Sequence, residues 1–301
     1  MQLTDNDFSR LIEAILARMP SHAKFIGHAL DILNEAEIAE ADDYIGHLLE
    51  HNSNDSLVDC YKTIVDDTLE CQIEFLRSGH YRHSTFAEVA SSVYFDDHYM
   101  KRYMIGLALS SFFWPNHTMI RRFFSEMLPT TSSGTYLEIG PGHGFFLVQA
   151  MRKSGFGKFV GVDISPASIA LTDSIVKDVL PDRRGDLELI EMDFLAKPGL
   201  EGQFEAIVMG EVLEHVEKPA AFLHRISELA APSAHIFITT CINAPAVDHI
   251  YLFRSASNIE ALFLEAGFTI RRQLHVPHPG YDLKRCVALN LPINVAYVLG
   301  K

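Results

Sequence analysis

The stretch that decides the fold is Leu137-Glu138-Ile139-Gly140-Pro141-Gly142-His143-Gly144, in which a run typical of a buried strand ends in three glycines at alternate positions. Glycine lacks a Cβ atom and adopts backbone conformations closed to other residues, so a ligand can lie close against such a turn. The spacing is G-x-G-x-G, whereas dinucleotide binders have G-x-G-x-x-G with a third glycine that serves helix packing. We therefore expect a binding turn for a ligand other than NAD.

Short runs rich in β-branched residues surround this turn and alternate with segments of helix length. The expected strands are residues 135–139, 158–163, 187–192, 204–209, 235–240, 268–276 and 294–299. Helical segments are expected to start near Gly144, Pro166 and Lys218, between the first five strands. Connections of this length join parallel strands through right-handed crossovers. The sequence thus predicts an α/β protein with a doubly wound sheet.

Residues 1–130 predict an all-helical domain, because apolar side chains recur three and four residues apart, as in Phe8, Leu11, Ile12, Ile15 and Leu16. Helix starts are expected at Thr4-Asp5, at Asn54-Asp55, and at Ser84-Thr85, where Glu88 is spaced as a capping box. A stretch rich in helix breakers, residues 129–134, follows. The predicted domains are therefore residues 1–130 and residues 131–301.

The net charge of −14 is unevenly distributed along the chain. Residues 1–130 hold 20 Asp and Glu against 10 Lys and Arg, whereas residues 131–301 hold 19 against 15. Nucleic-acid backbones demand clustered cations, so no nucleic-acid partner is expected.

The four cysteines lie far apart without a C-x-x-C pair, which argues against disulfides and cysteine zinc sites. Apolar stretches are too short to cross a bilayer and the N-terminus lacks a signal-peptide pattern, so we expect a cytoplasmic protein without a membrane partner.

Acidic residues mark three successive strand ends. Glu138 is suited to organising the ammonium group of a ligand that carries an amino acid. Asp163 ends the next strand and can accept both ribose hydroxyls of an adenosine, or alternatively cap a helix together with Ser165. Asp193 can accept from an adenine amino group while Phe194 packs on the ring. Together they predict sites for an amino acid, a ribose and a base along one sheet edge.

Residues 137–144, 160–165, 191–194 and Gly210-Glu211-Val212-Leu213-Glu214-His215-Val216 resemble the successive motifs of class I S-adenosylmethionine-dependent methyltransferases. The resemblance implies a seven-stranded sheet whose last strand, residues 294–299, is antiparallel. It also implies a binding site for S-adenosylmethionine, with S-adenosylhomocysteine as the product. The glycines would face the methionine part, and the other cofactor-binding residues would be Glu138, Asp163, Ile164, Asp193, Phe194, Gly210 and Glu211. Glu205 departs from the family, since many relatives carry Asp there.

The Leu213-Glu214-His215-Val216 element resembles that of small-molecule O-, C- and N-methyltransferases, including the ubiquinone O-methyltransferase type. It leaves the acceptor atom open. His215 follows the fourth strand and is a candidate base, because an imidazole titrates near neutrality. Alternatively, it closes the turn structurally, since methyl transfer can run on positioning alone. His249 is the second candidate catalytic residue.

A loop of polar and apolar residues, 239–251, follows the fifth strand, where open α/β sheets form substrate pockets. Asn243, Asp248 and Tyr251 are candidate substrate contacts, although Asp248 could instead cap the next turn. The pairs His275/His278 and Asp248/His249 show neither H-x-x-x-H nor a clear 2-His-1-carboxylate spacing. We therefore predict no metal.

Residues 94–117 concentrate aromatic side chains with polar tips just before the sheet domain. We expect this segment to cap the acceptor pocket, or alternatively to pack as ordinary core. Its candidate substrate contacts are Tyr94, Tyr99, Phe113, Trp114 and His117. Pro115 is expected to start a helix.

The sequence therefore predicts transfer of a methyl group to an O, N or C nucleophile of a small biosynthetic acceptor. A protein methyltransferase and a non-catalytic S-adenosylmethionine-binding partner subunit are the alternatives. A homodimer is compatible with either.

Overall fold

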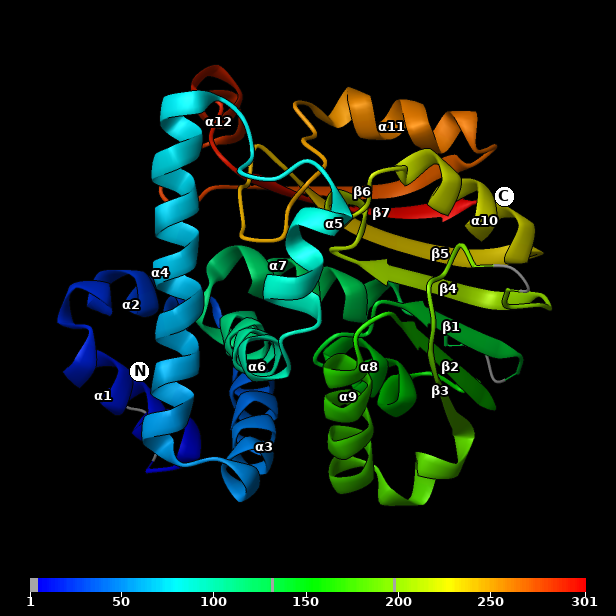
Figure 1. Cartoon of the computed structure of the whole chain (residues 1–301). Coiled ribbons are helices and arrows are strands. Elements are labelled where there is room, and N and C mark those ends of the chain that lie inside the picture. Colours follow the sequence, from blue (N-terminus) through cyan, green and yellow to red (C-terminus); the bar gives the residue numbers. More distant parts are fainter. Residues whose placement is uncertain (1–4, 131–132, 197–198) are drawn as a thin grey trace.

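The computed structural model describes residues 5–130, 133–196 and 199–301, and in it seven strands form one twisted sheet in the order β3-β2-β1-β4-β5-β7-β6 (Figure 1). The strands are β1 (Thr135–Ile139), β2 (Lys158–Asp163), β3 (Leu187–Glu191), β4 (Phe204–Gly210), β5 (Ala230–Ile242), β6 (Thr269–Pro277) and β7 (Ile293–Gly300). The first five strands are parallel, and β7 runs antiparallel to both of its neighbours. The seven expected strands and the antiparallel last strand are confirmed.

Helices cover both faces of the sheet. On one side lie α8 (Phe145–Lys153) and α9 (Pro166–Val179), and on the other lie α10 (Pro219–Leu229) and α11 (Ala256–Glu265), while α12 (Leu283–Leu289) precedes β7 (Figure 1). The expected starts near Gly144, Pro166 and Lys218 are confirmed, because Gly144 is the N-cap of α8 and Lys218 that of α10.

Side chains alternate between two cores along the strands, as the period of two requires. Tyr136 and Phe159 face the core that contains α8 and α9, whereas Leu137 and Val160 face the core that contains α10 and α11. The central strands are apolar on both faces because helices cover both, so they read as continuous apolar runs in the sequence.

The residues before the sheet are helical, as predicted. They form α1 (Asp7–Arg18), α2 (Ala23–Ile32), α3 (Glu35–His51), α4 (Asn54–Ser78), α5 (Phe86–Val89), a π-helical turn (Ala90–Tyr94), α6 (Asp97–Phe113) and α7 (Pro115–Met127). Thr85 and Glu88 form the expected capping box, and Pro115 starts α7. Thr4, Thr131 and Ser132 lie outside the described residues. Within the described chain, none of the helices combines the length and apolar character needed to cross a membrane.

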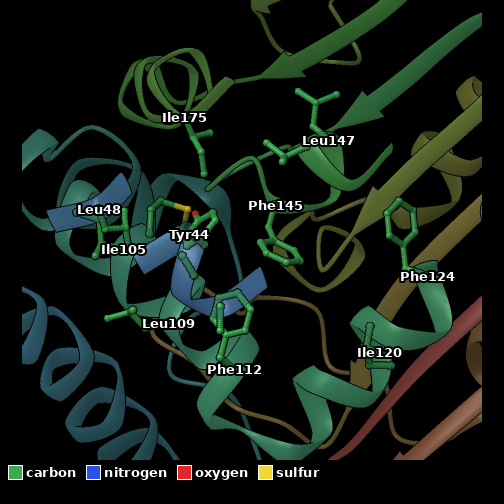
Figure 2. Packing of buried hydrophobic residues seen from close by; sticks show 14 of the residues in the cluster. Tyr44, Leu48, Ile105, Leu109, Phe112, Ile120, Phe124, Phe145, Leu147 and Ile175 are labelled. Carbon is green, nitrogen blue, oxygen red and sulfur yellow. The ribbon is translucent and has the colours of Figure 1, made fainter. Parts of the chain in front are cut away.

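The helical region and the sheet share one hydrophobic core (Figure 2). Tyr44 of α3, Phe112 of α6 and Phe145 of α8 meet with ring centroids 5.4 to 5.9 Å apart. Phe124 of α7 packs on Phe237 of β5 at 5.0 Å, and α7 also contacts β6, β7 and α8. The division of the chain at residue 130 stays a prediction, but the two parts are packed without a separating layer of solvent-exposed side chains.

Candidate active site

The glycine turn connects β1 to α8 in left-handed backbone conformations that only glycine adopts without strain. The φ angles of Gly140, Gly142 and Gly144 are 68°, 57° and 74°. A Cβ atom on Gly140 would lie 2.6 Å from Val212, and one on Gly142 would lie 3.3 Å from the sulfur of Met104. Gly140 and Gly142 therefore present no side chain to the cavity that they border. Gly144 lies outside the cavity lining and is the N-cap of α8.

Asp163 at the end of β2 has two backbone partners. Its Oδ1 accepts from the Ser165 N–H at 2.9 Å and its Oδ2 from the Gly142 N–H at 3.3 Å. Burial raises the pKa of Asp163 to about 6 despite these bonds. The carboxylate thus ties the glycine turn to β2 and still lines the cavity next to Ile164. The capping role and a ligand-binding role are compatible at this position.

The other expected cofactor residues also border this cavity. Asp193 follows β3 and accepts from the Leu195 N–H at 2.9 Å, and the ring of Phe194 packs on Phe222. Glu138 is 2% exposed and accepts from the Tyr136 hydroxyl at 2.6 Å. Burial raises the pKa of Glu138 to about 8, so a cationic ligand group beside it would favour its ionised form.

The end of β4 brings two glutamates together. Glu211 has φ 51°, which is unusual for a residue with a Cβ atom, and its Oε1 is buried without a hydrogen bond. Burial, followed by the nearby Glu214, raises the pKa of Glu211 well above its ordinary value. Glu214 is fully buried and accepts from the Thr240 hydroxyl at 2.7 Å. Strain and orphaned polar atoms at one strand end are typical of a functional site.

His215 ends a 3-10 turn (Leu213–His215) and forms an ion pair with Asp248 from the loop after β5. The His215 Nδ1 lies 3.3 Å from the Asp248 Oδ2 and 3.2 Å from the Asp248 main-chain oxygen. Burial alone would lower the pKa of His215, but Asp248 outweighs it and raises the pKa to about 9. Burial would likewise raise the pKa of Asp248, yet His215 lowers it to about 2. Asp248 is therefore an ion-pair partner and not the cap of a turn.

His249 stands edge-on to His215 with ring centroids 4.7 Å apart. Its Nδ1 lies 2.6 Å from the main-chain oxygen of Ala244, which can only accept, so Nδ1 carries the proton. Burial lowers the pKa of His249, which leaves its Nε2 as a free lone pair. His249 also has a donor atom within 4.8 Å of those of Glu214 and Cys241, and the same holds for the trio His215, Asp248 and His249. These trios are geometrically able to hold a metal ion.

Two tyrosines of the helical region contact the ion pair between His215 and Asp248. Tyr94, at the end of the π-helical turn, places its hydroxyl 3.0 Å from the His215 Nδ1 and donates to Asp248 at 3.4 Å. Tyr103 of α6 donates to the Asp248 Oδ1 at 3.1 Å. Tyr94 and Tyr103 of the helical region therefore contact the ion pair between His215 and Asp248. Such contacts are expected if the helical region caps the pocket. Tyr103 was missed by the sequence reasoning, although it lies one helical turn after Tyr99.

One cavity of about 770 Å³ runs from the glycine turn to the helices above the sheet edge. Among the residues predicted for substrate contact, it is lined by Tyr94, Trp114, His117 and Asp248. Trp114 donates to the Tyr61 hydroxyl at 3.1 Å, and burial together with His143 lowers the pKa of His117 to about 4.

Four other predicted substrate contacts lie outside the lining. Phe113 is fully buried in the core against Phe8, and Tyr99 donates to Asp67 at 2.6 Å. Asn243 is buried with φ 50°, and Tyr251 packs against Phe253. These four side chains lie around the pocket and not in its lining, and their contact with a substrate stays a prediction.

A glycine turn after β1 with acidic residues after β2 and β3, at the carboxyl edge of this sheet, defines a class I S-adenosylmethionine-dependent methyltransferase. The family model described as methyltransferase domain matches residues 115–273, more than half of the chain. The chain belongs to this family, and the predicted class is confirmed. The match begins at the first residue of α7, the helix that packs on the sheet.

Known proteins of different substrate classes are similar to the chain. Ubiquinone biosynthesis O-methyltransferase of Pseudoalteromonas translucida is 28% identical over 191 residues, which cover 54% of this chain and 74% of that protein. EEF1A lysine methyltransferase 2 of Homo sapiens is 29% identical over 132 residues, 41% of this chain and 53% of that protein. The solved structure of mitomycin 7-O-methyltransferase shares the fold with a TM-score of 0.55 and 13% identity, covering 78% of this chain and 68% of that chain.

The residues present fit S-adenosylmethionine as the methyl donor. Gly140 and Gly142 border the cavity without side chains of their own, and Glu138, Asp163 and Asp193 border the same cavity in the order of their strands. Gly210 and Glu211 line the cavity at the next strand end. These groups suit an ammonium, a ribose and a base in succession.

Proposed function

We propose that the enzyme methylates an aromatic hydroxyl group of a small, largely apolar acceptor, with His215 as the base. The observation that carries this proposal is the His215 and Asp248 ion pair, which lines the cavity and is closed over by Tyr94 and Tyr103. A base oriented by a buried carboxylate suits a hydroxyl acceptor, which must lose its proton. A neutral amine attacks through its lone pair without prior proton loss.

The pKa of His215 favours a phenolic acceptor over an aliphatic alcohol. A phenol has a pKa of about 10, as tyrosine does, and the pKa of His215 is about 9. Proton transfer between groups of similar pKa costs little free energy, and general-base catalysis is most efficient in that range. An aliphatic alcohol is a far weaker acid, so His215 would leave it almost fully protonated.

The shape of the cavity favours a small acceptor over a protein side chain. Its helical walls are largely apolar and come from α2, α4, α6 and the start of α7, through Phe25, Ile64, Leu69, Met100, Leu107 and Trp114. An apolar chamber with a few directed polar groups is typical of a small-molecule site. A protein substrate would need an open groove at this edge, which the helices cover.

The bound donor supplies a methyl group on a sulfonium centre. The Nδ1–H of His215 faces two acceptors on Asp248, so its Nε2 is the atom that takes the hydroxyl proton. The carbon–sulfur bond of the donor would break as the acceptor oxygen takes the methyl group, and His215 would keep the hydroxyl proton as an imidazolium paired with Asp248. Walls that hold the acceptor in line with the methyl group would supply much of the rate enhancement.

The test is an acceptor screen with S-adenosylmethionine labelled on the methyl group. Purified enzyme is incubated with matched sets of phenols, aliphatic alcohols and amines, and with a protein extract, and the products are identified by mass spectrometry. We expect labelled aryl methyl ethers, at a rate at least about 100-fold lower for His215→Asn. His224→Asn is the matched control, because it replaces an exposed histidine of α10 outside the cavity lining and should keep the parent rate. Label found only in amines or proteins, or a His215→Asn enzyme of full activity, would overturn the proposal.

A further inference from the structure

A second cluster of metal-binding side chains lies where α3 meets α9, outside the lining of the active-site cavity. His47 and His51 stand four residues apart on α3, and Asp178 is the next-to-last residue of α9. The sequence His47-Leu48-Leu49-Glu50-His51 has the H-x-x-x-H spacing, which the pairs Asp248/His249 and His275/His278 lack. Residues four apart on a helix share one face.

The donor atoms of this cluster lie close to one another. The Asp178 Oδ2 lies 3.0 Å from the His47 Nδ1 and 2.9 Å from the His51 Nε2, and one donor atom each of His47, Glu50, His51 and Asp178 lies within 4.8 Å of the others. Ligands that share a zinc ion at about 2.0–2.2 Å each lie little more than 3 Å from one another. The observed separations are close to that arrangement.

A buried donor without a hydrogen bond points into the cluster. His47 is 6% exposed, and its Nδ1 lacks a hydrogen bond of normal geometry although it lies 3.0 Å from a carboxylate oxygen. A buried polar atom left unpaired is costly, so its presence beside other metal-binding groups points to a ligand there. A cation between the imidazole and the carboxylate satisfies both.

We propose that His47, His51 and Asp178 bind a divalent transition-metal ion, with zinc as the best match, and that this ion clamps α3 to α9. Two imidazoles and a carboxylate are a common zinc donor set, and Glu50 or water completes the tetrahedral shell. Because His51 and Asp178 are partly exposed, the ion reaches the site without unfolding of the chain. The clamp joins the helical region to the sheet domain.

Both clamped helices also hold the glycine turn. Tyr44, one turn before His47 on α3, donates to the main-chain oxygen of His143 at 3.1 Å. Thr172 of α9 donates to the main-chain oxygen of Gly142 at 3.1 Å. An ion that fixes α3 against α9 therefore restrains the turn from two sides, and it should strengthen binding of S-adenosylhomocysteine.

The experiment uses the full chain after removal of metal with a chelator, titrated with zinc chloride in a calorimeter and followed by thermal unfolding. To keep zinc from the Glu214, Cys241 and His249 trio, all titrations are done in the His249→Ala background. We expect one zinc ion per chain and a rise in Tm of at least about 3 °C at saturating zinc. His51→Ala and Asp178→Asn should each weaken zinc binding at least tenfold.

His28→Ala is the matched control, because it removes an exposed histidine of α2 outside the cluster and should leave zinc binding unchanged. Crystals soaked in zinc should show an anomalous peak between His47, His51 and Asp178. The proposal is overturned if the chain binds no zinc, or if His51→Ala and Asp178→Asn bind it as tightly as the parent chain. Equal affinity for S-adenosylhomocysteine with and without zinc would overturn the coupling to the glycine turn.

Discussion

Replacement of Asp248 by asparagine removes the charge that sets the basicity of His215 while keeping the size of the side chain. Burial lowers the pKa of His215, but the Asp248 carboxylate, which is 2% exposed, outweighs burial with a smaller contribution from Glu214 and raises the pKa from 6.5 to about 9. Since one pKa unit equals about 1.4 kcal/mol, the environment favours the imidazolium by about 3 kcal/mol. The neutral amide of Asp248→Asn leaves burial as the dominant effect, so the pKa of His215 should fall to 6.5 or below.

The pH dependence of kcat/KM reports this change directly. A base must be unprotonated, and with a pKa near 9 only about 1% of His215 is neutral at pH 7. The parent enzyme should therefore gain about tenfold in rate per pH unit below pH 9 and level off above it. In Asp248→Asn the rise should occur at least two pH units lower, and the plateau should fall about 100-fold or more because the imidazole is a weaker and less oriented base.

The assay measures initial rates from pH 6 to 10 with a phenolic acceptor, under conditions in which chemistry limits turnover. Affinity for S-adenosylhomocysteine, measured by calorimetry, checks that the variant folds. Tyr103→Phe is the control, because it removes a hydrogen bond to Asp248 but keeps the ion pair, and it should leave the rise near pH 9. An Asp248→Asn enzyme with the parent plateau and a rise still near pH 9 would refute the assignment of His215 as the base.

Three further predictions concern the cofactor site, the cap and the packing. Gly142→Val and Asp163→Ala should each weaken S-adenosylhomocysteine binding at least tenfold, about 1.4 kcal/mol, and calorimetry showing unchanged affinity in both would contradict the cofactor site. Binding of S-adenosylhomocysteine should protect residues 94–117 from hydrogen exchange, whereas indifference of this segment would argue against a cap that closes. Gly106→Ala should lower stability by about 2 kcal/mol, because its Cβ would lie 2.5 Å from the main-chain oxygen of Cys60, and an unchanged Tm would contradict this.

The sheet could be predicted almost completely, because central parallel strands are continuous apolar runs and the glycine turn locates the first of them. The main difference lies in β5, which begins at Ala230 and not at residue 235. The segment Ala230-Ala231-Pro232-Ser233 contains a proline and no alternation of apolar residues, so its pattern does not indicate a strand. In the folded chain Ala230 pairs with Phe204 of β4, and a register shift follows before Ala206 pairs with His235. This pairing with β4 makes the segment part of β5.

Long-range contacts explain why the site was predicted less completely. The partner of Tyr103 is Asp248, 145 residues later, and only the fold brings them together. Phe113 was expected at the substrate, but it is buried outside the cavity lining; α6 is buried around most of its circumference, so its sequence has no polar stripe from which the orientation of Phe113 could be predicted. The H-x-x-x-H pair on α3 is visible in the sequence, but its carboxylate partner, Asp178, lies 127 residues beyond His51, so the sequence alone does not indicate the cluster.

The core that runs without interruption from α3 through α6 to α8 makes the helical region and the sheet a single cooperative unit. Deletion of residues 1–90 would remove Tyr44 and expose to water the rings of Phe112 and Phe145, against which Tyr44 packs. We expect one calorimetric transition for the whole chain and aggregation of the truncated one. If the helical regions of two relatives were exchanged to change acceptor preference, the residues of α8 that face the transplanted helices would have to be exchanged with them.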